Sequence, residues 1–129
     1  MKKILSAVPR VLFGLILFGA GLAGLLNKIP QEPMEGAAAL YMRGLGGTYL
    51  ITLVKLTEVA AGALLLANRF VPLALVIIAP VVINIAAFHL FYAPSGLAVP
   101  VLMIAAQIYL AWQHRAAFVP VLTAKQVAA

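Results

Sequence analysis

Four long apolar runs constrain this chain more than any other feature of its sequence. They cover residues 11–26, 44–67, 70–92 and 97–113, each near the roughly 20 residues that an α-helix needs to cross a bilayer. The chain is 65% hydrophobic and 9% charged, whereas soluble domains carry about 25% charged residues. The sequence therefore predicts an all-α integral membrane protein of four spans, with residues 1–129 forming a single membrane domain.

Short connections determine the predicted topology. Asn68 and Arg69 alone separate the second and third runs, and residues 93–96 separate the third and fourth. Such short connections make neighbouring helices antiparallel, so we predict an up-down four-helix bundle. The one long connection, residues 27–43, is expected to be an outer surface loop with room for a short helix over 37–42.

The distribution of basic residues predicts the orientation in the membrane. With the N-terminus inside, the cytoplasmic side carries six basic residues, whereas the outer side carries Lys28 and Arg43; the six are Lys2, Lys3, Arg10, Arg69, Arg115 and Lys125. The positive-inside rule then places both termini in the cytoplasm. Because the +6 net charge borders apolar runs instead of clustering on a polar face, no nucleic-acid partner is expected.

The first apolar run has two interpretations. Its Met-Lys-Lys start and the small residues at 20–23 also fit a secretory signal peptide. A retained helix is favoured by four glycines at packing positions, and Gly19 with Ala23, or Ala20 with Gly24, would let two helix backbones approach closely. The four are Gly14, Gly19, Gly21 and Gly24.

Two charged residues near the centre of the second run point to a site. Lys55 and Glu58 are three residues apart, so they share a helix face and can pair. Each would cost roughly 2.5–3.5 kcal/mol to insert, and Thr52 extends their face outward. One interpretation is an ion pair that fixes bundle assembly; the other is a binding or proton-handling site, the usual role of ionisable groups inside membranes.

The third and fourth runs supply candidate partners for this pair. Counted from the Asn68-Arg69 turn at about 1.5 Å per residue, Asn84 and Lys55 should lie at one depth. Pro80 should free the Val76 carbonyl there. It is interpreted either as part of a cavity wall or as an ordinary proline tolerated in a transmembrane helix. A lone membrane histidine such as His89, near the outer end, is more often hydrogen-bonded to a neighbour, but it could also exchange a proton near neutral pH. Gln107 in the fourth run is expected to face inward.

Several chemistries are not expected from this sequence. The chain has no cysteine, which excludes disulfides and thiolate ligands. His89 and His114 fall on opposite sides of the membrane, and no His-x-x-His or Glu-x-x-His pattern occurs, so we expect neither bis-His haem nor a bound metal. An enzyme of this kind would have to borrow a cofactor, such as a quinone from the bilayer.

Two stretches of the sequence resemble the DoxX family of small bacterial membrane proteins. The first is Lys55-Leu-Thr-Glu58-Val-Ala-Ala-Gly62 with Arg69-Phe-Val-Pro72; the second runs from Ala79-Pro80 through Asn84 to Phe88-His89-Leu-Phe91. The resemblance implies a four-helix inner-membrane protein, in a family named for a subunit associated with a thiosulfate:quinone oxidoreductase. Related eukaryotic proteins act as assembly chaperones or cargo receptors, so the fold alone does not determine function.

Three classes of function follow from these observations. The first is a membrane subunit that binds a quinone-like or other small hydrophobic molecule and serves a redox or oxidative-stress partner; its candidate ligand-binding residues are Lys55, Glu58, Asn84, His89, Thr52 and Gln107. Such a subunit would hold no covalent cofactor and, if an enzyme, would belong to an oxidoreductase. The second is an assembly or scaffold protein, and the third a small proton-coupled transporter. In each class we expect contact with membrane lipid and a protein partner or a homo-oligomer.

Overall fold

A computed structural model describes residues 1–28 and 33–129 of the chain. These residues form helices and no strand, which confirms the all-α prediction. The elements in chain order are α1 (Lys2–Leu25), α2 (Gly36–Gly46), α3 (Tyr49–Leu66), α4 (Val71–Tyr92), the 3₁₀ turn η1 (Pro94–Gly96), α5 (Ala98–Gln113) and α6 (Arg115–Leu122).

Three of these helices, α1, α3 and α4, are long and apolar enough to cross a membrane. This finding indicates a membrane protein. The predicted fourth span corresponds to α5, which is apolar but has 16 residues. At 1.5 Å per residue it is about 24 Å long, somewhat shorter than a hydrocarbon core of roughly 30 Å.

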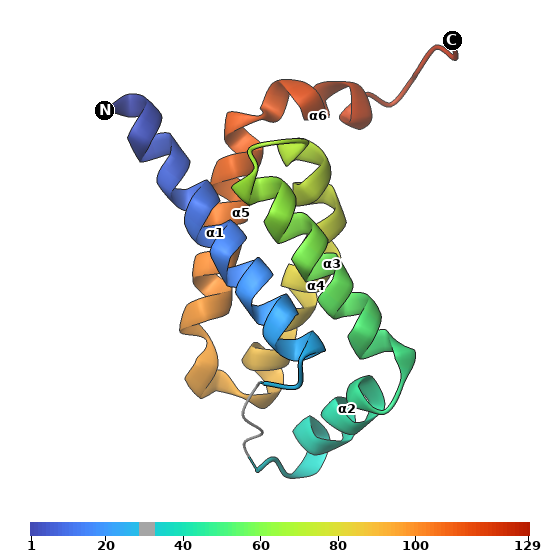
Figure 1. Cartoon of the computed structure of the whole chain (residues 1–129). Helices are drawn as coiled ribbons and strands as arrows, with labels where there is room; N and C mark the ends of the chain where they lie inside the picture. Colours follow the sequence, from blue (N-terminus) through green and yellow to red (C-terminus); the bar gives the residue numbers. More distant parts are fainter. Residues whose placement is uncertain (29–32) are drawn as a thin grey trace.

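Helices α1, α3, α4 and α5 lie side by side in Figure 1. Their inward side chains form one apolar core. Helix α1 packs most extensively on α3, α3 also contacts α4, α4 contacts α5, and α5 returns to α1. The core side chains include Phe13, Leu17, Leu65, Leu75, Ile78 and Leu110. Outward faces of the same helices are apolar too, as on Leu53, Ile83 and Leu102, which is the pattern of helices surrounded by lipid.

Glycine residues bring α1 and α3 unusually close together. A Cβ atom on Gly62 would lie 2.6 Å from the backbone nitrogen of Phe18, and one on Gly21 would lie 2.9 Å from the Cβ of Glu58. Gly14 and Gly24 also face α3, so three of the four predicted packing glycines are confirmed. Gly19 is the exception, since no described atom outside its own helical turn lies within 4 Å of its ideal Cβ. The Gly19–Ala23 pair is therefore not the packing pair.

The element boundaries differ from the predicted ones in three places. Helix α1 starts at Lys2, well before residue 11, because its basic residues do not interrupt the helix. The loop expected over 27–43 contains α2, which extends to Gly46 into the second apolar run. The Thr48 hydroxyl then accepts a hydrogen bond from the Leu50 N–H at 3.3 Å and begins α3, as an N-cap does. The hydropathy pattern predicted one continuous run over residues 44–67, because the junction between α2 and α3 carries no charge.

An asparagine ends each of α1 and α3, the two helices that pack most closely together. Beyond α1, Asn27 has φ 54°, and the Lys28 and Asn27 N–H groups donate to the Ala23 and Gly24 carbonyls. Beyond α3, Asn68 (φ 53°) makes the same arrangement. Both are Schellman motifs, in which a residue tolerant of positive φ stops the helix. Each of these asparagines therefore lies at one end of the interface between α1 and α3.

Candidate functional site

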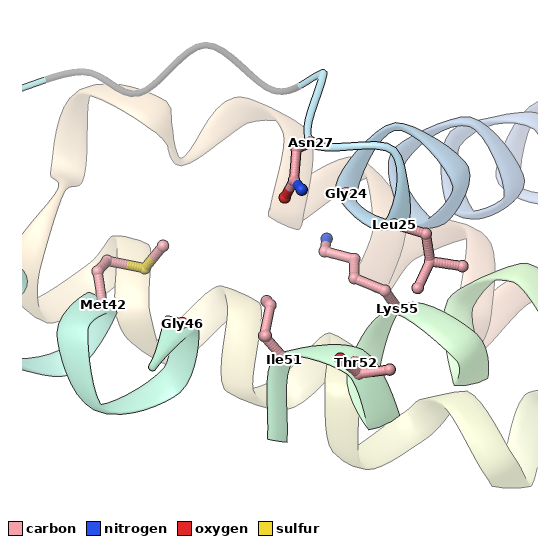
Figure 2. A pocket seen from close by; sticks show the side chains of 8 residues that line it. All are labelled: Gly24, Leu25, Asn27, Met42, Gly46, Ile51, Thr52 and Lys55. Carbon is pink, nitrogen blue, oxygen red and sulfur yellow. The ribbon is translucent and has the colours of Figure 1, made fainter. Parts of the chain in front are cut away.

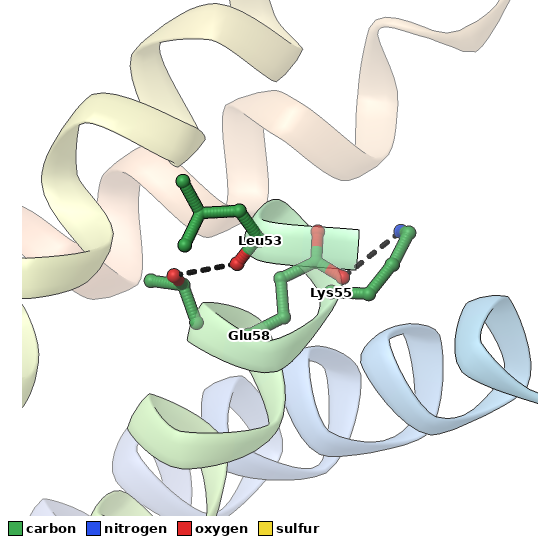
Figure 3. Close-up of polar contacts among 4 residues, drawn as sticks. Leu53, Lys55 and Glu58 are labelled. Atoms are coloured by element: carbon green, nitrogen blue, oxygen red, sulfur yellow. Dashed lines mark hydrogen bonds and ion pairs between the residues drawn. The ribbon is translucent and has the colours of Figure 1, made fainter. Parts of the chain in front are cut away.

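Lys55 and Glu58 form the predicted ion pair inside α3. Lys55 Nζ donates to Glu58 Oε2 at 2.9 Å, as Figure 3 shows. The Glu58 side chain is 2% exposed and that of Lys55 14%. Because both partners belong to one helix, α3 can carry the pair into a bilayer without help from another element. The nearby Thr57 hydroxyl donates to the Leu53 carbonyl at 2.8 Å, so that donor is satisfied within the helix.

A cavity of about 530 Å³ lies beside Lys55 at the end of the helices near α2. Figure 2 shows the Lys55 ammonium nitrogen directed into the space below Asn27. The cavity is lined by Gly24, Leu25, Asn27, Met42, Gly46, Ile51, Thr52 and Lys55. Polar groups of Asn27, Thr52 and Lys55 thus share one cavity with apolar walls, which is the composition of small-molecule sites.

Backbone features of three elements shape this cavity. The Schellman motif at the end of α1 places Asn27 at its rim. Helix α2 supplies Met42 and Gly46, and the first two turns of α3 supply Ile51, Thr52 and Lys55. Gly24 lets α1 lie against the stem of Lys55, because a Cβ at that position would come 2.5 Å from Lys55 Cδ. The lysine stem therefore lies directly against α1.

Asn84 does not join this cavity, contrary to the prediction that it meets Lys55. It is exposed on α4, and its amide donates a hydrogen bond to the Tyr41 hydroxyl of α2. The rise per residue sets the depth of a side chain but not its direction around the helix axis. The face that carries Asn84 also carries Phe88, whose ring lies 5.0 Å from that of Tyr41, so this face of α4 is directed at α2.

His89 also lies outside the residues that line the Lys55 cavity. Its Nδ1 is 2.8 Å from the Ile85 carbonyl, and its ring packs edge-on against Phe88, with centroids 5.5 Å apart. A Cβ on Gly96 would lie 2.7 Å from His89 Cδ2, so η1 covers one side of the ring. The structure places His89 in an aromatic cluster with Tyr41, Phe88 and Tyr92.

Gln107 faces inward, as predicted, but towards α4. Its Nε2 donates to the Leu75 carbonyl at 2.7 Å, and its Oε1 is buried with no hydrogen-bond partner among the described residues. Pro80 is exposed and the Val76 side chain is 54% exposed. The predicted cavity wall at Pro80 is therefore wrong, because that part of α4 turns its proline away from the bundle.

Of the six predicted site residues, the structure brings three together: Lys55, Glu58 and Thr52. Asn27 and Met42 also line the cavity but were not predicted to belong to the site. Both belong to the long connection between apolar runs, where hydropathy carries no signal. An asparagine directly after an apolar helix is typical of a C-cap, and that signal could have placed Asn27 at the helix end.

In comparisons with known proteins, no family model, no curated protein and no solved structure matches the chain.

Proposed function

We propose that this chain is a DoxX-like inner-membrane protein that binds a quinone-like or other small hydrophobic molecule beside Lys55. In this proposal it is a subunit that presents the molecule to a redox or oxidative-stress partner. One observation carries the proposal: a lysine held by a buried glutamate 2.9 Å away borders a cavity of about 530 Å³. A purely structural pair would not require an adjoining cavity.

The residues around the cavity fit a ring that carries carbonyl oxygens. Its volume lies within the range of roughly 300–1,000 Å³ that is usual for small-molecule sites. Lys55 can donate to one oxygen while it also pairs with Glu58, and the Thr52 hydroxyl and the Asn27 amide are further donors on the lining. Leu25, Met42 and Ile51 offer apolar surface. A bound quinone would supply two-electron redox chemistry; this chain would bind it, orient it and exclude water.

The proposed topology has four spans, with α5 as the fourth, and both termini in the cytoplasm. The excess of basic residues at that side supports it. The Lys55 cavity then opens towards the outer side, where α2 lies against α3 and α4. A hydrophobic molecule could enter there from the outer leaflet.

Binding of a short-chain ubiquinone analogue to the purified protein in nanodiscs tests the proposal. Lys55→Met should weaken binding roughly 10- to 150-fold, the value of a hydrogen bond from a charged donor. Arg43→Gln is the matched control, because Arg43 is an exposed cation of α2 that does not line the cavity. Equal affinity in wild type and Lys55→Met would contradict the proposal.

An assembly or scaffold function is the second candidate, and one contact favours it. Gly21 of α1 lies directly over the Cβ of Glu58, so the ion pair also fixes how α1 and α3 meet. In that case deletion of the gene should lower the abundance of a partner protein, and Lys55→Met should do the same without any change in quinone binding.

A further inference from the structure

A second cavity, of about 630 Å³, lies at the opposite end of the molecule from α2. It forms where the start of α1, the turn between α3 and α4 and the junction of α5 with α6 come together. Its lining residues are Lys3, Ser6, Ala7, Arg10, Asn68, Gln113, His114 and Arg115. Three of them are cations, and none of these described lining residues is acidic.

The two arginines are held in place by backbone carbonyls. Arg10 Nη1 donates to the Leu65 carbonyl and, at 3.5 Å, to that of Leu66, at the C-terminal end of α3. Arg115 Nη1 donates to the Trp112 carbonyl at 3.1 Å, and its guanidinium lies 5.1 Å from the centre of the Trp112 ring. A guanidinium has five N–H donors. Within the part of the chain that the structure describes, one nitrogen of each guanidinium is engaged, which leaves fixed donors for an anion.

The chemistry of this lining is that of a phosphate site. A planar guanidinium binds two oxygens of a phosphate at once, and lysine adds a point charge. The amides of Asn68 and Gln113 are neutral donors in the same lining. The Ser6 hydroxyl donates to the Lys3 carbonyl at 2.9 Å and is not counted among them. The glutamates that the structure describes, Glu35 and Glu58, belong to the α2 start and the α3 interior, so they do not neutralise these cations.

Apolar side chains exposed around the cavity indicate that the phosphate is part of a lipid. Ile4, Leu5 and Val8 are exposed on α1 beside Lys3 and Arg10, and Val119, Val121 and Leu122 are exposed on α6. Figure 1 shows α6 running across this end of the bundle, in the manner of a helix that lies in a membrane surface. Trp112, 68% exposed, is of the type enriched at that depth.

We propose that this cavity binds the phosphate of an anionic phospholipid headgroup, while the acyl chains lie along the exposed apolar residues of α1. The inference depends on the membrane-spanning helices and not on the function proposed for the Lys55 cavity. An anionic lipid bound there would hold the start of α1 against the α5–α6 junction. Its phosphate would neutralise the cations of the lining.

Lipid binding by purified protein, measured by native mass spectrometry with added phosphatidylglycerol or phosphatidylcholine, tests this proposal. Wild type should retain phosphatidylglycerol preferentially. The double variant Lys3→Gln, Arg115→Gln should bind it about 100-fold more weakly, at about tenfold for each charged hydrogen-bond donor removed. It leaves the Arg10 contacts with α3 intact, so folding should be preserved, and a thermal melt checks this.

Arg69→Gln is the matched control, because Arg69 is an exposed cation at the same end of the molecule that does not line the cavity. It should bind phosphatidylglycerol like wild type. A loss as large in Arg69→Gln as in the double variant would overturn the site in favour of general surface attraction. Equal retention of both lipids by wild type would overturn it as well. A third measurement adds inorganic phosphate, to distinguish a lipid headgroup from free phosphate as the ligand. Displacement of the lipid by phosphate at equal concentration would overturn the lipid assignment.

Discussion

Gly24 of α1 lies directly against the aliphatic stem of Lys55 in α3. A Cβ at position 24 would come 2.5 Å from Lys55 Cδ and 2.7 Å from Cε. The obstructing atoms belong to a flexible side chain and not to the backbone, so a methyl group there would displace the lysine and leave the helices in place. This contact links the packing of α1 and α3 to the position of Lys55, the cationic group among the described residues that line the cavity near α2.

Gly24→Ala should therefore weaken binding of the quinone analogue by roughly tenfold, as expected when one hydrogen bond from a charged donor is lost. Stability should change little, because Ala favours the helix by about 1 kcal/mol and offsets part of the cost of moving the stem. Gly19→Ala is the control, since it faces open space on the same helix. Titration of both variants checks the prediction, and unchanged binding in Gly24→Ala would show that the lysine position does not matter.

Gly62→Ala should instead destabilise the fold. Its Cβ would meet backbone atoms of α1, the Phe18 nitrogen at 2.6 Å and the Gly14 carbonyl oxygen at 2.9 Å, which cannot rotate away. We expect a loss of roughly 1–3 kcal/mol, the usual cost of overpacking. Thermal unfolding in detergent measures it, with Gly44→Ala as a control in α2 where a Cβ meets no described neighbour within 4 Å.

The ion pair was predictable because it is local, whereas the partners of Asn84 were not. Spacing within one helix determines that Lys55 and Glu58 share a face. The direction of Asn84 depends instead on how α4 is rotated about its axis, and that is set by the packing of Phe88 on Tyr41. The cavity beside Lys55 depends on α2, which lies in a segment without a hydropathy pattern. The all-α fold and the local ion pair therefore followed from the sequence, but the walls of the site did not.

Lys55 and Glu58 should be energetically coupled, but the two single substitutions should cost unequal amounts of stability. Lys55→Met leaves a carboxylate that is 2% exposed, whereas Glu58→Gln leaves an ammonium that borders a cavity. Breaking a fully buried pair costs about 3–5 kcal/mol, so Lys55→Met should approach that range and Glu58→Gln should cost less. The double variant should recover much of the loss. Additive losses in thermal stability would show that the two side chains do not interact.

Impermeant labelling of single cysteines in intact cells tests the proposed topology. The chain has no native cysteine, so each introduced one is unique. Ala37→Cys, on exposed α2, should be labelled, and Lys125→Cys should be labelled only after the cells are permeabilised. Position 37 is preferable to 36, because Gly36 has φ +62°, a conformation that a cysteine adopts only with strain. The reverse labelling pattern would place the Lys55 cavity on the cytoplasmic side.

The hydrogen bond from Asn84 to Tyr41 should attach α2 to α4 without affecting the Lys55 cavity. Asn84→Leu and Tyr41→Phe should each lower the free energy of unfolding by roughly 0.6–2 kcal/mol, the range for such bonds between membrane helices. Together they should cost no more than one of them alone, because each removes the same bond. Tyr49→Phe is the control, since the exposed Tyr49 hydroxyl makes no hydrogen bond within the described chain. All three variants should bind the quinone analogue like wild type. A large loss of binding in Asn84→Leu with unchanged stability would instead place Asn84 in the ligand site.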